Sequence, residues 1–215
     1  MSLTPGRAVL FDVDGTLLDV VANQRQVWTE WGRRHGFDPD WVYAEAVGTR
    51  PQETFAVVAP HLSLSQCIRA LDEIEDEDVR AGDYRAFDGA LELLEHLAPG
   101  AAALVTSNYE RRVRARFERM GLPVPAVVVD ADAVTRGKPD PEGYLTAARR
   151  LGVAPEDCLV IEDGITGMRA GAAAGMTVWA VNVDAAEAVQ AGAQRTFPSL
   201  ARASAEILAW QSGRG

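Results

Sequence analysis

The sequence predicts an α/β protein in which a mostly parallel sheet with helices on both faces is interrupted, after its first strand, by an inserted block of helices. Two observations carry this prediction. From residue 88 onward, short apolar runs alternate with amphipathic helical stretches, which is the pattern of βαβ units. Between the first apolar run at 8–11 and residue 86, the pattern is almost wholly helical.

The first apolar run, Ala8 to Phe11, has the length and composition of a buried strand. Apolar spacing in the block that follows predicts helices over 23–35, 40–47 and 51–58, and a longer one from Ser63 toward residue 82. Pro39 and Pro51 suit helix starts, and 63–66 has the spacing of a capping box. Residues 72–78 are almost wholly acidic, and we interpret them as a solvated face.

The remainder of the chain supplies the other strands and helices of the predicted sheet. Asp140 is expected to cap a helix that has Pro141 in its first turn and ends near 151. The other expected helices are 89–97, 110–120, 165–174 and 200–210, and the expected strands are 102–105, 126–129, 159–161 and 178–181. The predicted domains are a core of 1–16 and 87–215 and an inserted unit of 17–86, with a hinge at its two crossings.

Composition limits the possible partners. The chain has 215 residues, of which 47% are hydrophobic and 24% charged, as is ordinary for a globular protein. The formal net charge of −10 argues against nucleic acid or an anionic membrane as a partner. No segment has the length and apolar character of a membrane span or a secretory signal, and the two cysteines fit free thiols. We therefore expect a cytoplasmic protein that acts on a small molecule.

Two carboxylates, Asp12 and Asp14, come directly after the first strand. Because unpaired buried charge is costly, their position indicates that a cation lies between them or that one of them reacts. A calcium loop is excluded, since Gly15 comes too early and Leu17 and Leu18 fill ligand positions. An ordinary turn after the strand remains open at this point.

Further polar residues follow other expected strands. Thr106, Ser107 and Asn108 follow the strand at 102–105, and Glu162 and Asp163 follow the strand at 159–161. Ligands of open α/β sheets bind at the carboxyl ends of strands, so we expect these groups at one edge with the first two acids. Taken separately, the first group can simply cap a helix and the second can be an acidic turn.

Lys138 is the only lysine among 21 basic residues. A chain that uses arginine almost everywhere suggests that this position requires a compact ammonium group where a planar guanidinium would not serve. It lies in Gly137-Lys138-Pro139, before the helix that Asp140 is expected to cap, and thus at the same sheet edge. The surrounding sequence is not a P-loop, which requires serine or threonine after the lysine.

Taken together, these clusters resemble the four motifs of the haloacid dehalogenase (HAD) superfamily in their order along the chain. The segments 136–144 and 161–176 are similar to the phosphatase and phosphomutase branch that carries a helical cap after the first motif. Gly164, where many relatives have serine, and Asp88, where many have proline, depart from the pattern. The resemblance implies a Rossmann-like core with an all-helical cap.

The resemblance also implies an activity: Mg²⁺-dependent hydrolysis of small phosphomonoesters, such as sugar, polyol or glycolate phosphates, through an aspartyl-phosphate. Asp12 would be the nucleophile and Asp14 the acid and base. The implied metal ligands are Asp12, the backbone carbonyl of Asp14, and Asp163, with Glu162 as a further ligand or the partner of one.

The phosphoryl oxygens would be held by Lys138 and Thr106, with help from Ser107 and Asn108. The cap would supply the contacts that select the substrate. Arg50, in the segment 48–55, is the candidate for such a contact. A surface arginine at a helix start is the plain alternative for it.

Other activities of the family are separated by single residues. Relatives that cleave carbon–halogen bonds lack the second acid, Asp14, and relatives that cleave phosphonates need a lysine in the cap, which has none. A sugar phosphomutase remains open, and it would need a basic cap residue such as Arg50 for a distal phosphate. A non-catalytic phosphoryl-binding protein also remains open, although such a protein would usually have lost one of the two acids.

Overall fold

The computed structural model describes residues 6–213, and six parallel strands form its main sheet. Their order is β5-β4-β1-β6-β7-β8, so the first strand of the chain lies in the middle of the sheet. The bounds are Ala8–Phe11 for β1, Ala102–Val105 for β4, Val127–Val129 for β5, Cys158–Glu162 for β6, Thr177–Val181 for β7 and Arg195–Phe197 for β8. The predicted fold class is confirmed.

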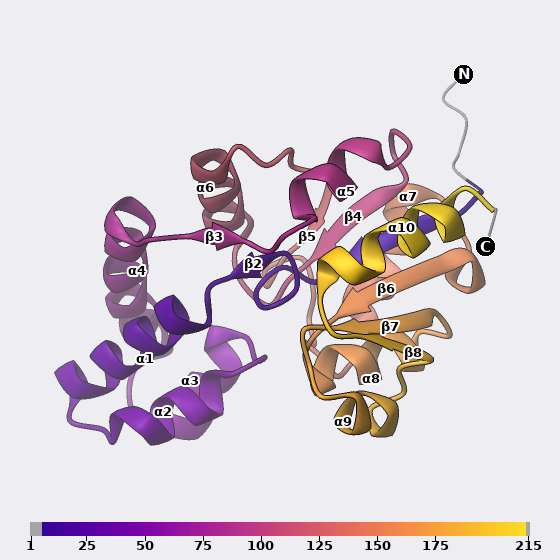
Figure 1. Cartoon of the computed structure of the whole chain (residues 1–215). Coiled ribbons are helices and arrows are strands. Elements are labelled where there is room, and N and C mark those ends of the chain that lie inside the picture. Colours follow the sequence, from indigo (N-terminus) through magenta and orange to yellow (C-terminus); the bar gives the residue numbers. More distant parts are fainter. Residues whose placement is uncertain (1–5, 214–215) are drawn as a thin grey trace.

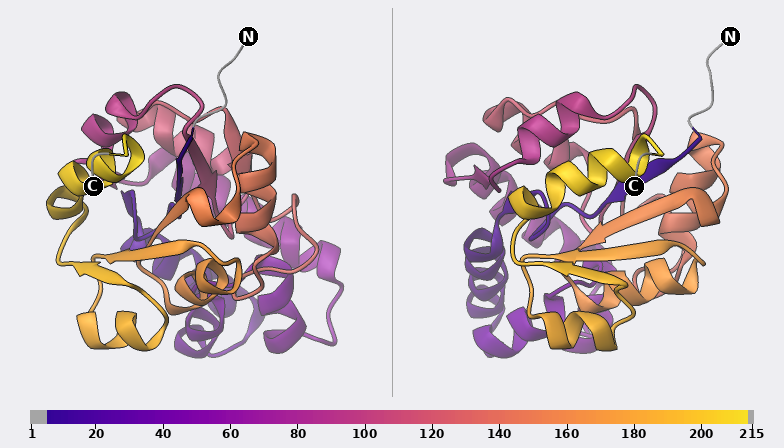
Figure 2. Two further views of the ribbon diagram at one scale, coloured as in Figure 1. Left: turned by 90° about the vertical axis from the view of Figure 1, so that its right-hand side faces the viewer. Right: turned by 45° about the vertical axis from the view of Figure 1, so that its right-hand side comes forward.

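Helices cover both faces of this sheet (Figures 1 and 2). Because successive side chains of a strand point to opposite faces, Val9 and Phe11 pack in one cluster and Ala8 and Leu10 in the other. The first cluster includes residues of α5 (Ala90–His96), α6 (Glu110–Met120) and α10 (Leu200–Gln211). The second includes residues of α7 (Glu142–Leu151), α8 (Ile165–Ala173) and α9 (Ala185–Gln190).

Four helices inserted after the first strand form the cap: α1 (Val21–His35), α2 (Pro39–Ala46), α3 (Pro51–Val58) and α4 (Leu64–Ala81). They enclose a separate hydrophobic core that includes Trp31, Phe55 and Leu71. A short antiparallel ribbon of β2 (Leu18–Asp19) and β3 (Arg85–Ala86) joins the two crossings between cap and core (Figure 1). The division of the chain at residues 17–86 into separate domains stays a prediction.

The predicted elements agree closely with those observed. The helices at 51–58 and 110–120 and the strands at 8–11 and 102–105 have the predicted bounds, and the other predicted elements differ by one or two residues. Five short elements, each of six residues or fewer, were not predicted from the sequence: β2, β3, β8, α9 and a 3-10 turn at Pro155–Asp157. Such segments are too short for hydrophobic periodicity to identify.

Two predicted helix caps differ from the structure. Ser63 is the cap residue of α4 as predicted, but its side chain makes no capping hydrogen bond and pairs with the hydroxyl of Ser65 instead. The cap residue of α7 is Pro141 rather than Asp140, whose carboxylate accepts from the backbone N–H of Glu142. A short polar side chain can satisfy several nearby groups, so spacing alone does not fix its partner.

The acidic run at 72–78 is not a simple solvated face, which corrects the interpretation from sequence. Asp72 and Glu75 on α4 form ion pairs with Arg112 on the core helix α6, and Asp72 also pairs with the neighbouring Arg111. Both the Arg112 and Glu75 side chains are almost fully buried. The acidic face of the cap therefore packs on a basic face of the core.

Candidate active site

Three charged side chains meet where β1 and β6 end. The ammonium of Lys138 lies 2.5 Å from Oδ1 of Asp12 and 2.6 Å from Oε1 of Glu162, and all three side chains are at most 10% exposed. Burial alone would lower the pKa of the lysine, but the two carboxylates raise it above its ordinary value. Lys138 is thus held as a cation between two acids from neighbouring strands.

The carboxylate of Glu162 has all four of its hydrogen bonds within the protein. Oε1 accepts from Lys138 and from the hydroxyl of Tyr144, and Oε2 accepts from the backbone N–H groups of Asp163 and Gly164. Gly167 makes room for this group, because a Cβ there would lie 1.5 Å from Oε1. The arrangement leaves Glu162 well suited to holding Lys138.

Asp163 is held from the turn after β1. Its Oδ1 accepts a hydrogen bond of 2.8 Å from the hydroxyl of Thr16, which is fully buried. Gly15 has a φ of +96°, and a Cβ there would lie 2.1 Å from Oδ2 of Asp163. Glycine is needed at this turn both for its backbone conformation and for the close approach of the carboxylate.

The carboxylates of Asp12, Glu162 and Asp163 offer oxygen atoms that lie within 4.8 Å of one another. An all-oxygen donor set of this kind suits Mg²⁺, which prefers carboxylates and water. Three acids share one cation, Lys138, so a bound dication would supply the missing positive charge. The residues present therefore fit a magnesium site.

Magnesium binding should weaken as the pH falls. Burial, together with the neighbouring Glu162, raises the pKa of Asp163 to about 7, and burial raises that of Asp12 well above its ordinary value. Below pH 7 a proton must leave before the metal binds, so we expect the affinity to fall about tenfold per pH unit for each displaced proton. Calorimetric titration of Mg²⁺ at pH 5.5, 6.5 and 7.5 measures this, and an unchanged affinity would contradict it.

The polar residues after β4 lie close to these acids. The hydroxyl of Thr106 accepts from the backbone N–H of Asn108, and it keeps its own proton as a donor for a ligand. The amide of Asn108 donates to Oδ2 of Asp14 over 3.4 Å. Ser107 reaches toward the cap, where its hydroxyl contacts the carbonyl of Gly48 at 3.4 Å. The side chains of this segment do not cap α6, whose first backbone N–H, that of Glu110, is bound by the carboxylate of Asp130 instead.

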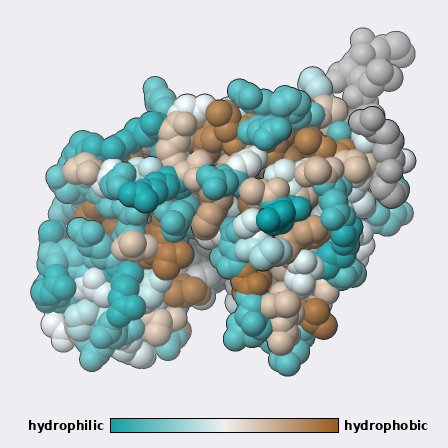
Figure 3. All heavy atoms as spheres, in the orientation of Figure 1, coloured by the Kyte–Doolittle hydropathy of each residue, from teal (hydrophilic) through white to brown (hydrophobic). Residues whose placement is uncertain are grey.

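A cavity of about 190 Å³ contains the predicted residues from all four motifs and extends to the cap. The space-filling view shows the molecule hollowed between the part built by α1–α3 and the part that carries α8 and α9 (Figure 3). On the cap side the cavity is lined by residues of α1, α2, α4 and the loop before α3, among them Gln24, Trp28, Tyr43, Thr49 and Glu75. A larger hollow of about 1010 Å³ along α1 and α4 contains none of the motif residues.

Arg50 is not among the described residues that line this cavity. Its side chain is buried, and its guanidinium donates to the backbone carbonyls of Val134 and Thr135, each at 2.8 Å, and to Glu53 of the same cap helix. Glu53 in turn accepts from the backbone N–H of Gly137, next to Lys138. In this structure Arg50 therefore connects the cap to the core loop that carries the lysine, and it is not placed to contact a substrate.

We expect Arg50→Ala to lower kcat/KM about tenfold for every phosphate ester, because it removes the charged hydrogen bonds to core carbonyls that hold the cap on the core. Steady-state kinetics on a minimal aryl phosphate and on a sugar phosphate measure this. Arg25→Ala is the matched control, since Arg25 pairs with Asp40 inside the cap. A changed substrate preference with an unchanged aryl phosphate rate would instead support the role in substrate recognition predicted from the sequence.

Three buried side chains around the site were not predicted from the sequence. Thr16 supports Asp163, and its place after Asp-x-Asp-Gly was an available signal. Tyr144 supports Glu162 from α7, six residues after Lys138, and nothing in its spacing marks it. Arg116 of α6 reaches Asp14. Because α6 contains several arginines, the sequence did not distinguish this one from the others.

The chain is similar to proteins of known family. The model for haloacid dehalogenase-like hydrolases matches residues 7–175. Hexitol phosphatase A of Escherichia coli is 38% identical over 184 residues, which cover 83% of this chain and 84% of that protein. Validoxylamine A 7'-phosphate phosphatase of Streptomyces hygroscopicus is 34% identical over 182 residues, which cover 79% and 83%. The crystal structure of CbbY from Rhodobacter sphaeroides, in complex with phosphate, superposes with a TM-score of 0.79 at 26% identity and covers 92% of this chain and 96% of that one.

The fold, the acidic site at the carboxyl ends of its strands and these matches define the class: the chain belongs to the haloacid dehalogenase-like hydrolase family. Within that family it is a phosphatase of the helical-cap type. The described part of the chain contains no helix that is both long and apolar enough to cross a membrane.

Proposed function

We propose that the protein is a Mg²⁺-dependent phosphatase that hydrolyses small phosphomonoesters of sugars and polyols through an aspartyl-phosphate. The observation that carries the proposal is the contact of Lys138 with both Asp12 and Glu162, beside Asp163, in a cavity that the cap lines on one side. These contacts support roles for Asp12 as the nucleophile, for Lys138 as the phosphate-binding cation and for the neighbouring acids as metal ligands. Similarity to hexitol phosphatase A supports the choice of substrate.

In the first step an oxygen of Asp12 attacks phosphorus, and the bond between phosphorus and the leaving-group oxygen breaks. Lys138 and the hydroxyl of Thr106 bind the phosphoryl oxygens and keep them in line with the nucleophile. Asp14 donates its proton to the leaving alkoxide, which departs as an alcohol.

In the second step Asp14, now ionised, takes a proton from a water molecule, whose oxygen attacks the phosphorus of the aspartyl-phosphate. The bond between phosphorus and Asp12 breaks, which releases phosphate and restores both acids. Bound Mg²⁺, held by Asp12, Asp163 and the carbonyl of Asp14, would neutralise phosphoryl charge. Glu162 acts by orienting Lys138, and the cap excludes bulk water.

The cavity lining supports a neutral leaving group. Lys138 is the only lysine or arginine among the described residues that line the cavity, and it is engaged by the transferred phosphoryl group. A second anionic group, as in a bisphosphate or in phosphoglycolate, would lie unpaired beside the Glu75 carboxylate, which is costly. Trp28, Tyr43 and Gln24 offer aromatic faces and hydrogen bonds that suit a hydroxylated carbon chain.

The same lining disfavours the alternative of a sugar phosphomutase. That activity requires a cap cation for the distal phosphate of a bisphosphate, and the candidate for it, Arg50, is bound to core carbonyls outside the cavity. We therefore propose hydrolysis rather than phosphoryl return to the sugar.

The test is phosphate release in Mg²⁺ from a panel of hexitol, hexose and glycerol phosphates, phosphoglycolate, a hexose bisphosphate and nucleotides, with Asp12→Asn as the blank. We expect release from the monophosphates of polyols or sugars and at least tenfold less from phosphoglycolate and the bisphosphate, which carry a second anionic group. Conversion of glucose 1-phosphate to glucose 6-phosphate after a bisphosphate primer is added, without release, would instead establish a mutase. No phosphate release and no mutase activity would favour a non-catalytic phosphoryl-binding protein.

A further inference from the structure

Arg116, on the core helix α6, is a buried arginine that the mechanism above does not use. Its side chain is 1% exposed, and its Nη1 lies 3.3 Å from Oδ1 of Asp14. The other oxygen of that carboxyl group, Oδ2, is the one that Asn108 approaches. Asp14 therefore has a donor on each oxygen, and the two donors come from the same segment of chain, after β4.

Burying a guanidinium so completely requires compensating groups. Burial would lower the pKa of Arg116, but the carboxylates of Asp14 and Glu75 raise it above its ordinary value. The guanidinium also lies 5.3 Å from the ring centre of Tyr84, whose hydroxyl donates to Asp78 at the end of α4. The arginine is thus enclosed on all these sides and has few alternative positions.

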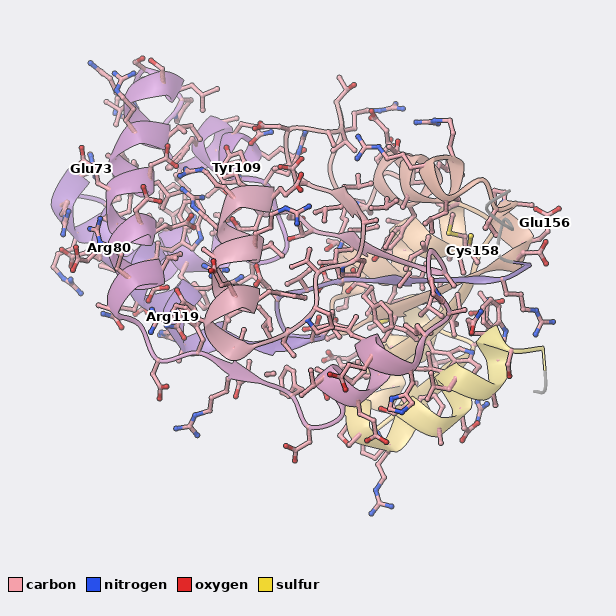
Figure 4. All side chains as sticks on the ribbon, turned by 90° about the horizontal axis from the view of Figure 1, so that it is seen from above. Glu73, Arg80, Tyr109, Arg119, Glu156 and Cys158 are labelled. Atoms are coloured by element: carbon pink, nitrogen blue, oxygen red, sulfur yellow. The ribbon has the colours of Figure 1, made fainter. Side chains whose placement is uncertain are left out.

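A second buried arginine, Arg112, lies one helical turn earlier on the same face of α6. It is also 1% exposed, but it forms its ion pairs with Asp72 and Glu75 of the cap rather than with Asp14. Seen from above, α6 runs beside α4, with Tyr109 and Arg119 labelled toward the two ends of α6 and Glu73 and Arg80 on α4 (Figure 4). Arg119 also contacts α4 and the residue after it, through the carbonyls of Val79 and Gly82. Among these arginines of α6, Arg116 is the one that points to the catalytic acid.

We propose that Arg116 is a positioning residue that holds the carboxyl group of Asp14 toward the oxygen of the leaving group. The inference rests on the proposed function, in which Asp14 is the proton donor. A carboxyl group on a short side chain at the mouth of a cavity has several rotamers, and only some direct its proton at the substrate. A fixed guanidinium on one oxygen and an amide on the other restrict that choice.

The role of Arg116 is tested by comparing leaving groups. An alkyl phosphate such as glycerol phosphate needs a proton as the ester bond breaks, whereas p-nitrophenolate leaves readily without one. For Arg116→Gln we expect kcat/KM to fall about 10- to 100-fold for the alkyl ester, since general acid catalysis contributes about 10²- to 10⁴-fold. For p-nitrophenyl phosphate we expect a change within about threefold, because Asp12 and Lys138 are untouched.

Arg112→Gln is the matched control, because it removes an equally buried arginine of the same helix that does not contact Asp14. Arg112→Gln should lower kcat/KM for the alkyl ester and for p-nitrophenyl phosphate by the same factor. A parallel loss on both substrates in Arg116→Gln would overturn the inference, since a purely structural role predicts that result. If Arg116→Gln does not fold, Arg116→Lys, which keeps the buried charge, replaces it. We expect a smaller loss in this variant, again selective for the alkyl ester. A lysine variant without that selective loss would overturn the inference.

Asp14→Asn separates this inference from the proposed function. It should show the same selective loss on the alkyl ester, and more strongly than Arg116→Gln. If Asp14→Asn is selective and neither Arg116 variant is, Arg116 has no positioning role and the proposed function stands. If Asp14→Asn lowers both esters equally, the role of Asp14 as the proton donor fails, and the inference fails with it.

Discussion

Replacement of Asp12 by asparagine should reduce phosphate release by at least about a thousandfold, equivalent to about 4 kcal/mol of transition-state stabilisation. An amide nitrogen and a neutral oxygen cannot replace a carboxylate as the nucleophile. The other acid that contacts Lys138, Glu162, cannot take over, because both of its oxygens already accept hydrogen bonds from protein groups. The fold should persist, since Asp12 lies just after the end of β1 and Lys138 keeps its second partner, Glu162. The readouts are phosphate release and thermal unfolding.

A second measurement follows the intermediate itself. Acid-quenched wild-type protein should retain labelled phosphate after brief reaction with a labelled ester, and Asp12→Asn should retain none. Asp130→Asn is a suitable control, because Asp130 lies at the same sheet edge but accepts hydrogen bonds from the N-terminus of α6 and from Ala133. It should keep activity within a few-fold of wild type. Label retained by Asp12→Asn would refute the assignment of the nucleophile.

The second large effect is expected at Lys138. Lys138→Arg keeps the charge, yet it should lose at least about a hundredfold in kcat/KM. The ammonium sits between Asp12 and Glu162 at 2.5 and 2.6 Å and also lies 5.5 Å from the ring centre of Tyr144, so a planar guanidinium cannot occupy this space without displacing one of them. Wild-type activity in this variant would contradict the prediction that position 138 requires a compact ammonium group.

Lys138→Met tests the same site through stability. It leaves the buried carboxylates of Asp12 and Glu162 without their cation, and we expect the metal-free protein to lose about 3–5 kcal/mol in its free energy of unfolding. Urea denaturation at neutral pH measures the loss. Added Mg²⁺ should restore part of it, because the dication replaces the missing positive charge. A variant as stable as wild type without metal would contradict the account of Lys138 as the compensating charge.

The sequence by itself determined the class of the fold and the edge of the sheet at which its chemistry gathers. Apolar runs of strand length that alternate with helical periods leave little choice of architecture, because each element must bury its apolar face. Acids after β1 and β6 and a lone lysine before α7 pointed to one edge, since parallel strands place their carboxyl ends together. Short elements such as β2, β3 and α9 carried too few residues for such a signal.

The partners of each charge were decided only by the tertiary structure. The acidic run of α4 and the arginines of α6 each resemble an ordinary solvated face, and their pairing across cap and core depends on how the two packed together. Likewise, Arg50 was predicted to reach the substrate but donates to core carbonyls, and Arg116 reaches Asp14 from 102 residues away in sequence. A long side chain can reach any of several groups, and burial selects among them because every buried charge must find a partner.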